Sequence, residues 1–335
     1  MPENELKTTS MAKPYQSWLK QQYAVDDLVL QPLSGDAGSR RYFRFFLGNQ
    51  SLILTDFSRE PTHMQSFCQH TQAFAALNLP VPHIMMVDQH NHYLIQADLG
   101  DTTLLKSITD TPSSYKTLYA MALGILLQLQ QQSHALQSLP QLNTQAIQQE
   151  LDCFDHWYCD RYLAAPLSTS ERQIWQSCCK QISQAMGHQP QVAVHRDFHA
   201  RNLMVTENTM TMIDHQDAVI GPVGYDIISL AYDCYVDHPV AQRLQWLKQH
   251  HQALQQQHII PADTTFNTYQ DWCMVCAGQR LLKVLGVFAR LGLRDQKLGF
   301  LKDLHLTHHH LMSVITSHPI LKPLHPIVQS RPPHT

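Results

Sequence analysis

The chain contains 335 residues, of which 44% are hydrophobic and 15% are charged, and its formal net charge at pH 7 is −3. This length exceeds the ~250–300 residues that one hydrophobic core usually supports, so we expect two packed lobes. The slightly negative charge offers no basic excess to neutralise a phosphate backbone, which argues against nucleic acid as the main partner and favours small ligands.

Neither the N-terminal residues nor the most apolar stretch of the chain suggests export or insertion into a membrane. Residues 1–13 mix charged residues with Ser and Thr and lack the apolar segment of a signal peptide. The most apolar stretch, residues 119–127, is shorter than the ~20 residues that a spanning helix needs. We therefore expect a cytoplasmic protein. Its eight irregularly spaced cysteines predict reduced, buried thiols, and the histidine run at 308–310 predicts a solvated helix face.

The first part of the chain reads as a β-sheet with one helix. Short runs of aromatic and β-branched residues predict strands at residues 41–47, 51–57 and 92–96. An amphipathic pattern at residues 62–77 predicts a helix between them. These elements predict a β-rich N-terminal lobe over residues 1–98.

After residue 104 the pattern changes to long amphipathic helices, expected at residues 113–132, 144–163, 168–186, 239–257 and 269–291. One strand-rich island, residues 192–213, interrupts them. The sequence therefore predicts an α+β fold with a helical C-terminal lobe over residues 99–335 and a hinge near 96–101. The proline-rich tail after residue 318 is expected to be a loosely held extension.

The strand-rich island carries an acidic loop. His195, Asp197 and Asn202 are spaced as His-x-Asp-x-x-x-x-Asn, and Asp214 follows the next strand. Phosphoryl transfer needs a carboxylate that accepts a hydroxyl proton and oxygen ligands that hold Mg²⁺ on the phosphates. Asp197 can supply the first, and Asn202 with Asp214 can supply the second. The alternative is a loop whose aspartates only accept hydrogen bonds from its own backbone. That alternative does not explain why the spacing, the flanking strands and the second aspartate all match the phosphoryl-transfer pattern.

This pattern resembles the signature of the protein-kinase-like superfamily. Only 12 positions separate Asp214 from Asp226, the residue expected to brace the loop, and a Gly-Pro turn lies between them. The peptide-binding segment of a protein kinase does not fit in that gap. The chain is therefore similar to the aminoglycoside phosphotransferase and choline kinase branch. The resemblance implies a protein-kinase-like two-lobe fold, ATP and Mg²⁺ as cofactors, and a small-molecule acceptor.

Nucleotide-binding residues are expected in two places. Residues 34–42 read Ser-Gly-Asp-Ala-Gly-Ser-Arg-Arg-Tyr, and the glycines and backbone N–H groups of such a loop can cover phosphates. The hinge is the second place. The full set of expected nucleotide contacts is Ser34, Gly35, Gly38, Ser39, Arg40, Arg44, Asp98 and Leu99.

One element of the kinase pattern is missing. The predicted strand at 51–57 has no lysine to bind phosphate, and the following helix has no glutamate to pair with it. Loss of both members is physically coherent, because one unpaired charge in such a site is costly. Arg40, Arg41 or Arg44 can replace the positive charge, and the sequence does not choose among them. A nucleotide-binding scaffold without turnover stays an alternative.

Stretches across most of the chain are similar to the anomeric kinases of peptidoglycan recycling, which phosphorylate the C1 hydroxyl of N-acetylmuramate and N-acetylglucosamine. The most discriminating stretch is Gln279-Arg280-Leu-Leu-Lys283 with Gly286. Its cations, Arg280 and Lys283, are expected to neutralise the lactyl carboxylate of the substrate. The alternative is that they are basic side chains paired with Asp233 or Asp237.

Other candidate contacts to the acceptor lie near the acidic loop. Arg201, next to Asn202, is expected to hold the acceptor or the transferred phosphate, and Asp217 to bind a second Mg²⁺ or a sugar hydroxyl. Asp233, in another matching stretch, is assigned to the substrate by the same resemblance. An aminoglycoside or amino-alcohol acceptor stays open because acidic residues that suit a cationic substrate are also present: Asp152, Asp155 and Asp160.

Overall fold

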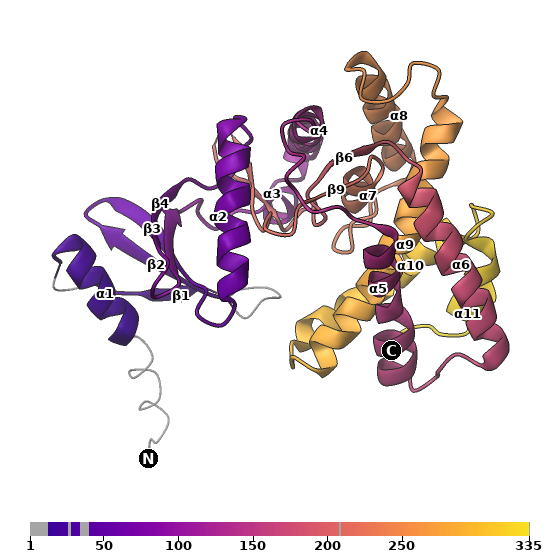
Figure 1. Cartoon of the computed structure of the whole chain (residues 1–335), viewed down its shortest axis with the longest axis horizontal. Helices are drawn as coiled ribbons and strands as arrows, with labels where there is room; N and C mark the ends of the chain where they lie inside the picture. Colours follow the sequence, from indigo (N-terminus) through magenta and orange to yellow (C-terminus); the bar gives the residue numbers. More distant parts are fainter. Residues whose placement is uncertain (1–12, 26–27, 34–39, 208, 335) are drawn as a thin grey trace.

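The computed structural model describes residues 13–25, 28–33, 40–207 and 209–334. Two lobes follow one another along the chain, a smaller lobe built on a sheet and a larger, mostly helical lobe (Figure 1). This arrangement confirms the predicted α+β fold with a β-rich first lobe. The phosphate-loop residues expected at positions 34–39 (Ser34, Gly35, Gly38 and Ser39) lie outside the described residues.

The first lobe contains an antiparallel sheet with the strand order β1-β2-β3-β5-β4. The long strands β2 (Arg41–Leu47) and β3 (Gln50–Asp56) form a hairpin in which Arg41 pairs with Asp56. Gly48 turns the chain between them with φ of 58°, a left-handed conformation that glycine adopts without strain. The other strands are β1 (Gln31–Leu33), β4 (Ile84–Asp88) and β5 (Tyr93–Ala97).

Alternate residues of this sheet face two different layers. Leu52 and Leu54 of β3 pack in a cluster with Tyr15 and Leu19 of α1 (Lys13–Tyr23), a helix that the sequence patterns did not predict. Ile53 and Thr55 face the opposite side, where α2 (Pro61–Ala76) lies. The sheet thus has a covered outer face and an inner face turned toward the second lobe.

The connection between the lobes is short. β5 ends at Ala97, and α3 (Leu104–Asp110) begins after Thr103, whose hydroxyl caps the helix by accepting the Lys106 N–H. Gly100 has φ of 77°, which a side chain would strain. The predicted lobe boundary at residue 98 and the hinge at 96–101 fall in this segment and stay predictions.

The second lobe is built from helices around a long central one. Its long helices are α4 (Tyr115–Gln131), α5 (Thr144–Cys153), α6 (Thr169–Gly187), α8 (Val240–Gln256), α9 (Phe266–Leu293) and α10 (Leu304–Ile315). The predicted helix at 144–163 continues from α5 as a π-helix, Phe154–Tyr162. The shorter elements are η1 (Pro112–Ser114), η3 (Leu298–Asp303), η4 (Lys322–Leu324) and α11 (His325–Gln329).

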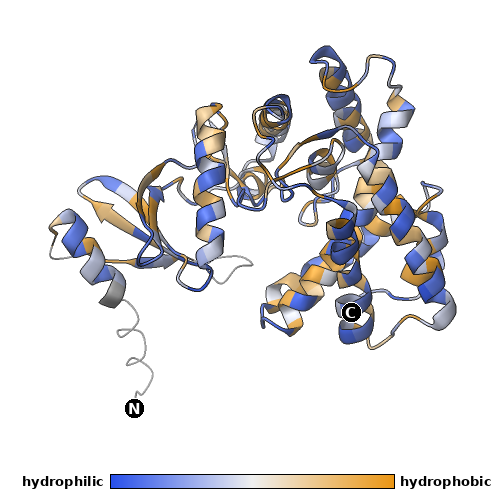
Figure 2. Cartoon of the chain, in the orientation of Figure 1, coloured by the Kyte–Doolittle hydropathy of each residue, from blue (hydrophilic) through white to orange (hydrophobic). Residues whose placement is uncertain are grey.

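Helix α9 forms the centre of this lobe. It is largely hydrophobic, whereas the outer helix α8 is largely hydrophilic (Figure 2). By length and composition α9 could cross a membrane, but 78% of its apolar window is buried inside the molecule, as in the core helix of a globular lobe. A Cβ added at Gly286 would lie 2.3 Å from the backbone carbon of Cys153. The glycine therefore lets α9 approach the α5 and π-helix segment at backbone distance.

The C-terminal segment corrects the expectation of a loose extension. Leu321, Leu324 and Val328 are fully buried, and Arg331 donates to both carboxylate oxygens of Glu171 at the start of α6, at 2.7 and 3.0 Å. The prolines of this tail restrict the backbone without preventing burial of the leucines between them. The tail is therefore an integral layer of the second lobe.

Two expectations about special residue types have different outcomes. All eight cysteines are free thiols, and most of them are buried, including Cys273 and Cys276, which confirms the prediction. The histidine run was wrongly placed on a solvated face, because His310 is fully buried beside Arg243 on α8. Consecutive positions on a helix point in different directions, so one member of the run reaches the core.

Candidate active site

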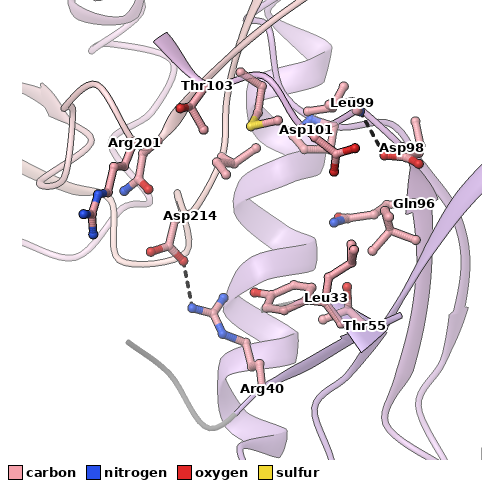
Figure 3. A pocket seen from close by; sticks show the side chains of 18 of the residues that line it. Leu33, Arg40, Thr55, Gln96, Asp98, Leu99, Asp101, Thr103, Arg201 and Asp214 are labelled. Atoms are coloured by element: carbon pink, nitrogen blue, oxygen red, sulfur yellow. Dashed lines mark hydrogen bonds and ion pairs between the residues drawn. The ribbon is translucent and has the colours of Figure 1, made fainter. Parts of the chain in front are cut away.

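A cavity of about 460 Å³ lies between the two lobes. One part of it is apolar and is lined by Leu33, Ile53, Phe67, Met204 and Ile213. The other end is polar and is lined by Arg40, Arg201, Asn202 and Asp214, while the hinge segment 96–101 lines a further side. Figure 3 shows the side chains of both lobes pointing into this space. An apolar slot that ends in charged groups suits a ligand with a flat ring and an anionic tail.

Two short antiparallel strand pairs position the acidic loop. Strand β6 (Gln191–Val194) pairs with β9 (Val219–Pro222), and β7 (Leu203–Val205) pairs with β8 (Met210–Met212). The loop between β6 and β7 carries Asp197 and Asn202, and the residues after β8 carry Asp214. The Ile213 N–H donates to the Asn202 carbonyl at 3.0 Å, which places the two predicted metal ligands side by side.

Two buried carboxylates hold the loop from below. Asp226, on α7 (Tyr225–Ala231), accepts the backbone N–H groups of His195 and Arg196 at 2.6 and 3.0 Å, which confirms it as the predicted brace. Asp233 accepts the N–H groups of Ala200 and Tyr235, both at 2.8 Å. Burial raises the pKa of Asp226 to about 7 and that of Asp233 to about 6.

The assignment of Asp233 to the substrate stays a prediction, and the structure shows backbone partners for this residue. Its side chain is fully buried, and both carboxylate oxygens are occupied by backbone donors of the loop and of the turn that follows α7. No acceptor molecule reaches this carboxylate in the present conformation. Asp233 therefore acts on the site through the loop that it positions.

Backbone strain marks two residues of the site. Arg196 and Asp214 have φ of 75° and 63°, in the left-handed region that residues with a Cβ seldom adopt. Such conformations cost of order 1–3 kcal/mol and persist where the surrounding structure enforces them. Here the Asp226 brace holds the first residue, and the β7–β8 hairpin holds the second. The strain turns the Asp214 carboxylate toward the cavity.

The charge of Asp197 is set by its surroundings. Burial raises the pKa of this carboxyl, but nearby positive charges, above all that of Lys283, lower it well below its ordinary value. Asp197 is therefore ionised at neutral pH. An ionised carboxylate in the acidic loop is in the protonation state that a proton acceptor requires.

Asn202 and Asp214 fit a magnesium ion. Asn202 donates its Nδ2 to the Asp197 carbonyl oxygen at 3.1 Å, which leaves Oδ1 as an acceptor. The Asp214 side chain is 36% exposed and lines the cavity. Mg²⁺ prefers oxygen ligands and commonly takes one or two from the protein and the rest from phosphates and water. The oxygen donors present match that preference.

The arginines near the start of β2 have different partners. Arg41 is bound by Asp56, at 2.8 Å from its Nε, on the side of the sheet where Tyr15 lies. Arg44 lies outside the cavity lining, where it is held by Asp98 at 2.6 Å and by Asp101 at 2.8 Å. The contact of Arg44 with nucleotide stays a prediction, and in this structure Arg44 pairs with the carboxylates of the segment that connects the lobes.

Arg40 is the arginine of this group that lines the cavity. Its Nη2 donates to Asp214 at 2.7 Å, and its Nη1 donates to Gln216 at 3.0 Å. The first of these contacts is drawn as the dashed line between Arg40 and Asp214 in Figure 3. Of the predicted hinge contacts, Asp98 and Leu99 also line the cavity.

A buried charge network lies beside Asp197. Glu150 of α5 binds Arg196, Lys283 at 3.2 Å and Gln279 at 2.7 Å. Burial raises the pKa of Glu150, but the positive charges of Lys283 and Arg196 lower it by more. The pKa therefore lies below its ordinary value, and the carboxylate is ionised. No motif in the sequence identified Glu150, because it lies in an ordinary amphipathic helix pattern and finds its partners only when α5 and α9 pack.

The two predicted substrate cations of α9 differ in access. Lys283 retains 14% exposure of its side chain. Arg280 is only 2% exposed, and its Nε and Nη1 have no hydrogen-bond partner. Contact of Arg280 with a substrate does not occur in this conformation. Its charge instead lies among Asp197, Asp233 and other buried groups.

Two further predicted residues lie at the edge of the site. Arg201 stacks its guanidinium 3.7 Å from the ring centre of Tyr235 and lies 3.8 Å from Asp303. Asp217 is exposed, and its carboxylate accepts from Gln216 at 3.2 Å. The structure thus brings Arg201, Asn202 and Asp214 to one end of the cavity, and Asp197 lies on the same loop, hydrogen-bonded through its backbone carbonyl to Asn202.

The two lobes, the cavity between them and the braced acidic loop define a kinase-like phosphotransferase fold. Solved structures with this fold include aminoglycoside phosphotransferase APH(2'')-Ib bound to ADP, at a TM-score of 0.59 and 14% identity over 88% of this chain and 96% of that one. Choline kinase LicA from Streptococcus pneumoniae aligns at a TM-score of 0.55 and 12% identity over 90% of this chain and 99% of that one.

The chain belongs to the phosphotransferase enzyme family, whose model matches residues 29–258. A Pseudomonas aeruginosa protein named N-acetylmuramate/N-acetylglucosamine kinase is 32% identical over 90% of this chain and 88% of its own length. A Pseudomonas putida protein of the same name is 30% identical over 97% and 96% of the two chains. The chain is accordingly a kinase that transfers phosphate to an alcohol group, as predicted.

Proposed function

We propose that this enzyme uses ATP and Mg²⁺ to phosphorylate the C1 hydroxyl of N-acetylmuramate and N-acetylglucosamine in the cytoplasm, as a step of cell-wall recycling. The chemistry is supported above all by Asn202 and Asp214, which line the polar end of the cavity, and by Asp197, whose backbone carbonyl accepts the Asn202 side-chain N–H on the same loop. The choice of acceptor is supported by the relatives that bear this name and match almost the whole chain.

The nucleotide is expected to span the cavity. Its base occupies the apolar part between Ile53 and Met204, against the hinge residues Asp98 and Leu99, and its phosphates extend toward Asp214. Asn202 and Asp214 would hold Mg²⁺, and the ion would supply positive charge that neutralises the phosphates.

The reaction is a direct transfer between two oxygens. Asp197 accepts the proton of the C1 hydroxyl as the sugar oxygen forms a bond to the γ-phosphorus, and the bond to the β,γ-bridging oxygen breaks to release ADP. The low pKa of Asp197 makes it a weak base. Its contribution is therefore orientation of the hydroxyl and late acceptance of the proton, which suits a loose phosphoryl-transfer transition state.

The acceptor is expected to lie between the acidic loop and α9. Lys283 is the more accessible of the two α9 cations predicted to bind substrate, so it is our candidate for binding the lactyl carboxylate of N-acetylmuramate. Arg201 is placed to bind the acceptor or the transferred phosphate. The acidic residues that favoured an aminoglycoside are partly neutralised, since Asp155 pairs with Arg172 at 2.5 Å and Asp160 with Arg161 at 3.6 Å.

An acceptor panel tests this proposal. ADP release is measured with N-acetylmuramate, N-acetylglucosamine, the methyl glycoside of N-acetylglucosamine, choline and kanamycin. We expect turnover with the first two and none with the methyl glycoside, because its C1 oxygen is blocked. Turnover of kanamycin or choline with neither free sugar would contradict the acceptor, and retained turnover of the methyl glycoside would contradict the C1 position.

A further inference from the structure

Strand β3 contributes no charged side chain to the lining of the cavity. The residues of β3 that line it are Ile53 and Thr55, and the Thr55 hydroxyl is buried without a hydrogen-bond partner. Kinases of this fold class use a strand lysine to bind phosphate oxygens. Here the first lobe must supply positive charge from another position or leave the phosphates without it.

Arg40 is the cation that the described part of the first lobe brings to the cavity lining. Arg41 and Arg44, the other candidates in the sequence, are bound by carboxylates elsewhere, Arg41 by Asp56 and Arg44 by Asp98. Arg40 has a side-chain exposure of 9% and extends across the gap between the lobes. It therefore places a guanidinium fork where the polar end of the cavity begins.

The partners of Arg40 recreate a charge pair in a new position. Its Nε lies 3.9 Å from the carboxylate of Glu60, the residue immediately before α2. Arg40, next to β2, and Glu60, next to α2, thus lie close together. The usual kinase pair, a lysine on the strand and a glutamate on the helix, is missing from β3 and α2. Gln216 orients the same guanidinium, because its Oε1 accepts a hydrogen bond from Arg40 Nη1 at 3.0 Å and its Nε2 donates to Asp214, also at 3.0 Å.

We propose that Arg40 binds the terminal phosphates of the nucleotide and replaces the missing strand lysine. The inference rests on the proposed ATP chemistry but not on which alcohol accepts the phosphate. In this structure Arg40 Nη2 shares Asp214 Oδ1, an oxygen that we assign to Mg²⁺. When Mg²⁺ and nucleotide bind, Arg40 exchanges this carboxylate oxygen for phosphate oxygens, to which a guanidinium can donate in two parallel hydrogen bonds.

Titration calorimetry with a series of nucleotides tests the role without any acceptor. Adenosine, ADP with Mg²⁺ and ATP with Mg²⁺ are titrated into the wild type, Arg40→Met, Arg40→Lys and Arg59→Met. Arg59 is an exposed arginine of the same lobe and controls for loss of one positive charge. A charge-assisted contact corresponds to about a ten- to hundredfold change in Kd.

We expect Arg40→Met to weaken ATP by that factor, ADP by less, and adenosine by less than twofold. Arg40→Lys should recover part of the loss, and Arg59→Met should behave as wild type. Equal weakening of adenosine and ATP would show that Arg40 only supports the fold, and unchanged ATP affinity in Arg40→Met would overturn the inference. Failure of the wild type to bind ATP at all would instead contradict the proposed function.

Discussion

At the scale of single residues, the site depends on side chains whose charge is fixed by neighbours far away in the sequence. Asp197 is ionised because Lys283 and other cations outweigh its burial, and Lys283 is itself held by Glu150. The acidic loop keeps its shape because Asp226 and Asp233 accept its backbone N–H groups. The charge of Asp197 and the shape of the loop that carries it are therefore set by different buried residues.

The first prediction concerns Asp197. Asp197→Asn keeps the shape of the side chain but cannot accept the hydroxyl proton, so kcat should fall by on the order of 10²–10⁴. The Kd of ATP should stay within a few-fold, since the carboxylate faces the acceptor. Steady-state kinetics and calorimetry measure the two quantities. A variant with unchanged kcat would show that another group, or none, takes the proton.

A second prediction separates the two α9 cations that the sequence assigned to the substrate, Arg280 and Lys283. Lys283→Met should lower kcat/KM for N-acetylmuramate about ten- to a hundredfold relative to N-acetylglucosamine, because only the first sugar carries a carboxylate. Glu150 keeps Arg196 and Gln279 as partners, so it is not left unpaired by this change. Arg280→Met is the comparison. Since Arg280 is buried, we expect it to affect both sugars equally and to lower the melting temperature.

Equal losses on the two sugars in Lys283→Met would assign Lys283 to the structure of the site. A selective loss on N-acetylmuramate in Arg280→Met, at an unchanged melting temperature, would mean that the lobe opens enough for substrate to reach this buried guanidinium. Both enzymes are compared at saturating ATP, so that only acceptor binding and transfer are measured.

At the scale of elements, sequence periodicity predicted the long helices and the hairpin strands well, because each has one continuous apolar face. The pattern failed where burial depends on a partner that the sequence does not show. Helix α1 is covered by the sheet through Tyr15 and Leu19, and the proline-rich tail is buried through Leu321 and Leu324. The loop residues Asp197, Asn202 and Asp214 could be predicted because their spacing reflects one local arrangement of loop and strands. The sequence did not show that Asp233 accepts a backbone N–H of this loop, because it lies on a different element.

The packing of α9 gives a prediction about stability. Gly286→Ala would place a Cβ against the Cys153 backbone, 2.3 Å from its carbonyl carbon, which cannot move as a flexible side chain would. We expect a loss of about 1–3 kcal/mol or more in the free energy of unfolding. Gly124→Ala, in α4, is the matched control, since nothing lies within 4 Å of its added Cβ.

The control should be neutral or stabilising by about 0.4–1 kcal/mol, because alanine restricts the unfolded chain. Urea unfolding followed by circular dichroism gives both values. If Gly286→Ala is as stable as Gly124→Ala, the close contact between α9 and the π-helix segment is not a constraint on the fold.

The ion pair that fastens the C-terminal tail predicts a pH dependence. Hydrogen bonds from Arg331 are the main cause that lowers the pKa of Glu171 from 4.5 to about 2. Because the folded-state pKa lies below the unfolded one, the pair contributes stability above pH 4.5 that is lost as the pH falls toward 2. Glu171→Gln removes the charge but keeps a residue that can complete the capping box with Ser168.

We expect Glu171→Gln to lower the free energy of unfolding by about 1–2 kcal/mol at neutral pH. The difference from wild type should narrow as the pH is lowered through 4.5, the ordinary pKa of this carboxyl. Denaturant unfolding of both proteins at several pH values gives the measurement. A difference that stays constant across this range would show that the charge of Glu171 does not fasten the tail.

At the scale of the whole molecule, function depends on two lobes that each supply half of the site. The first lobe contributes Arg40 and the apolar wall at Ile53, and the second contributes the acidic loop and Asp214. The Arg40–Asp214 ion pair joins the lobes directly across the cavity. Sequence motifs indicated the two parts of the site separately, and the folded arrangement shows that the first lobe contacts the second through the guanidinium of Arg40.

Nuclear magnetic resonance of the product tests the central claim most directly. The enzyme is incubated with ATP, Mg²⁺ and N-acetylmuramate, with Asp197→Asn as the control, and the product is examined by ³¹P and ¹H spectra. We predict a new phosphate signal coupled to the anomeric proton in the α configuration, which shows a phosphate ester at C1, and its near absence with Asp197→Asn. A phosphate coupled to any other sugar proton, or no sugar phosphate while the enzyme consumes ATP with another alcohol, would contradict the account.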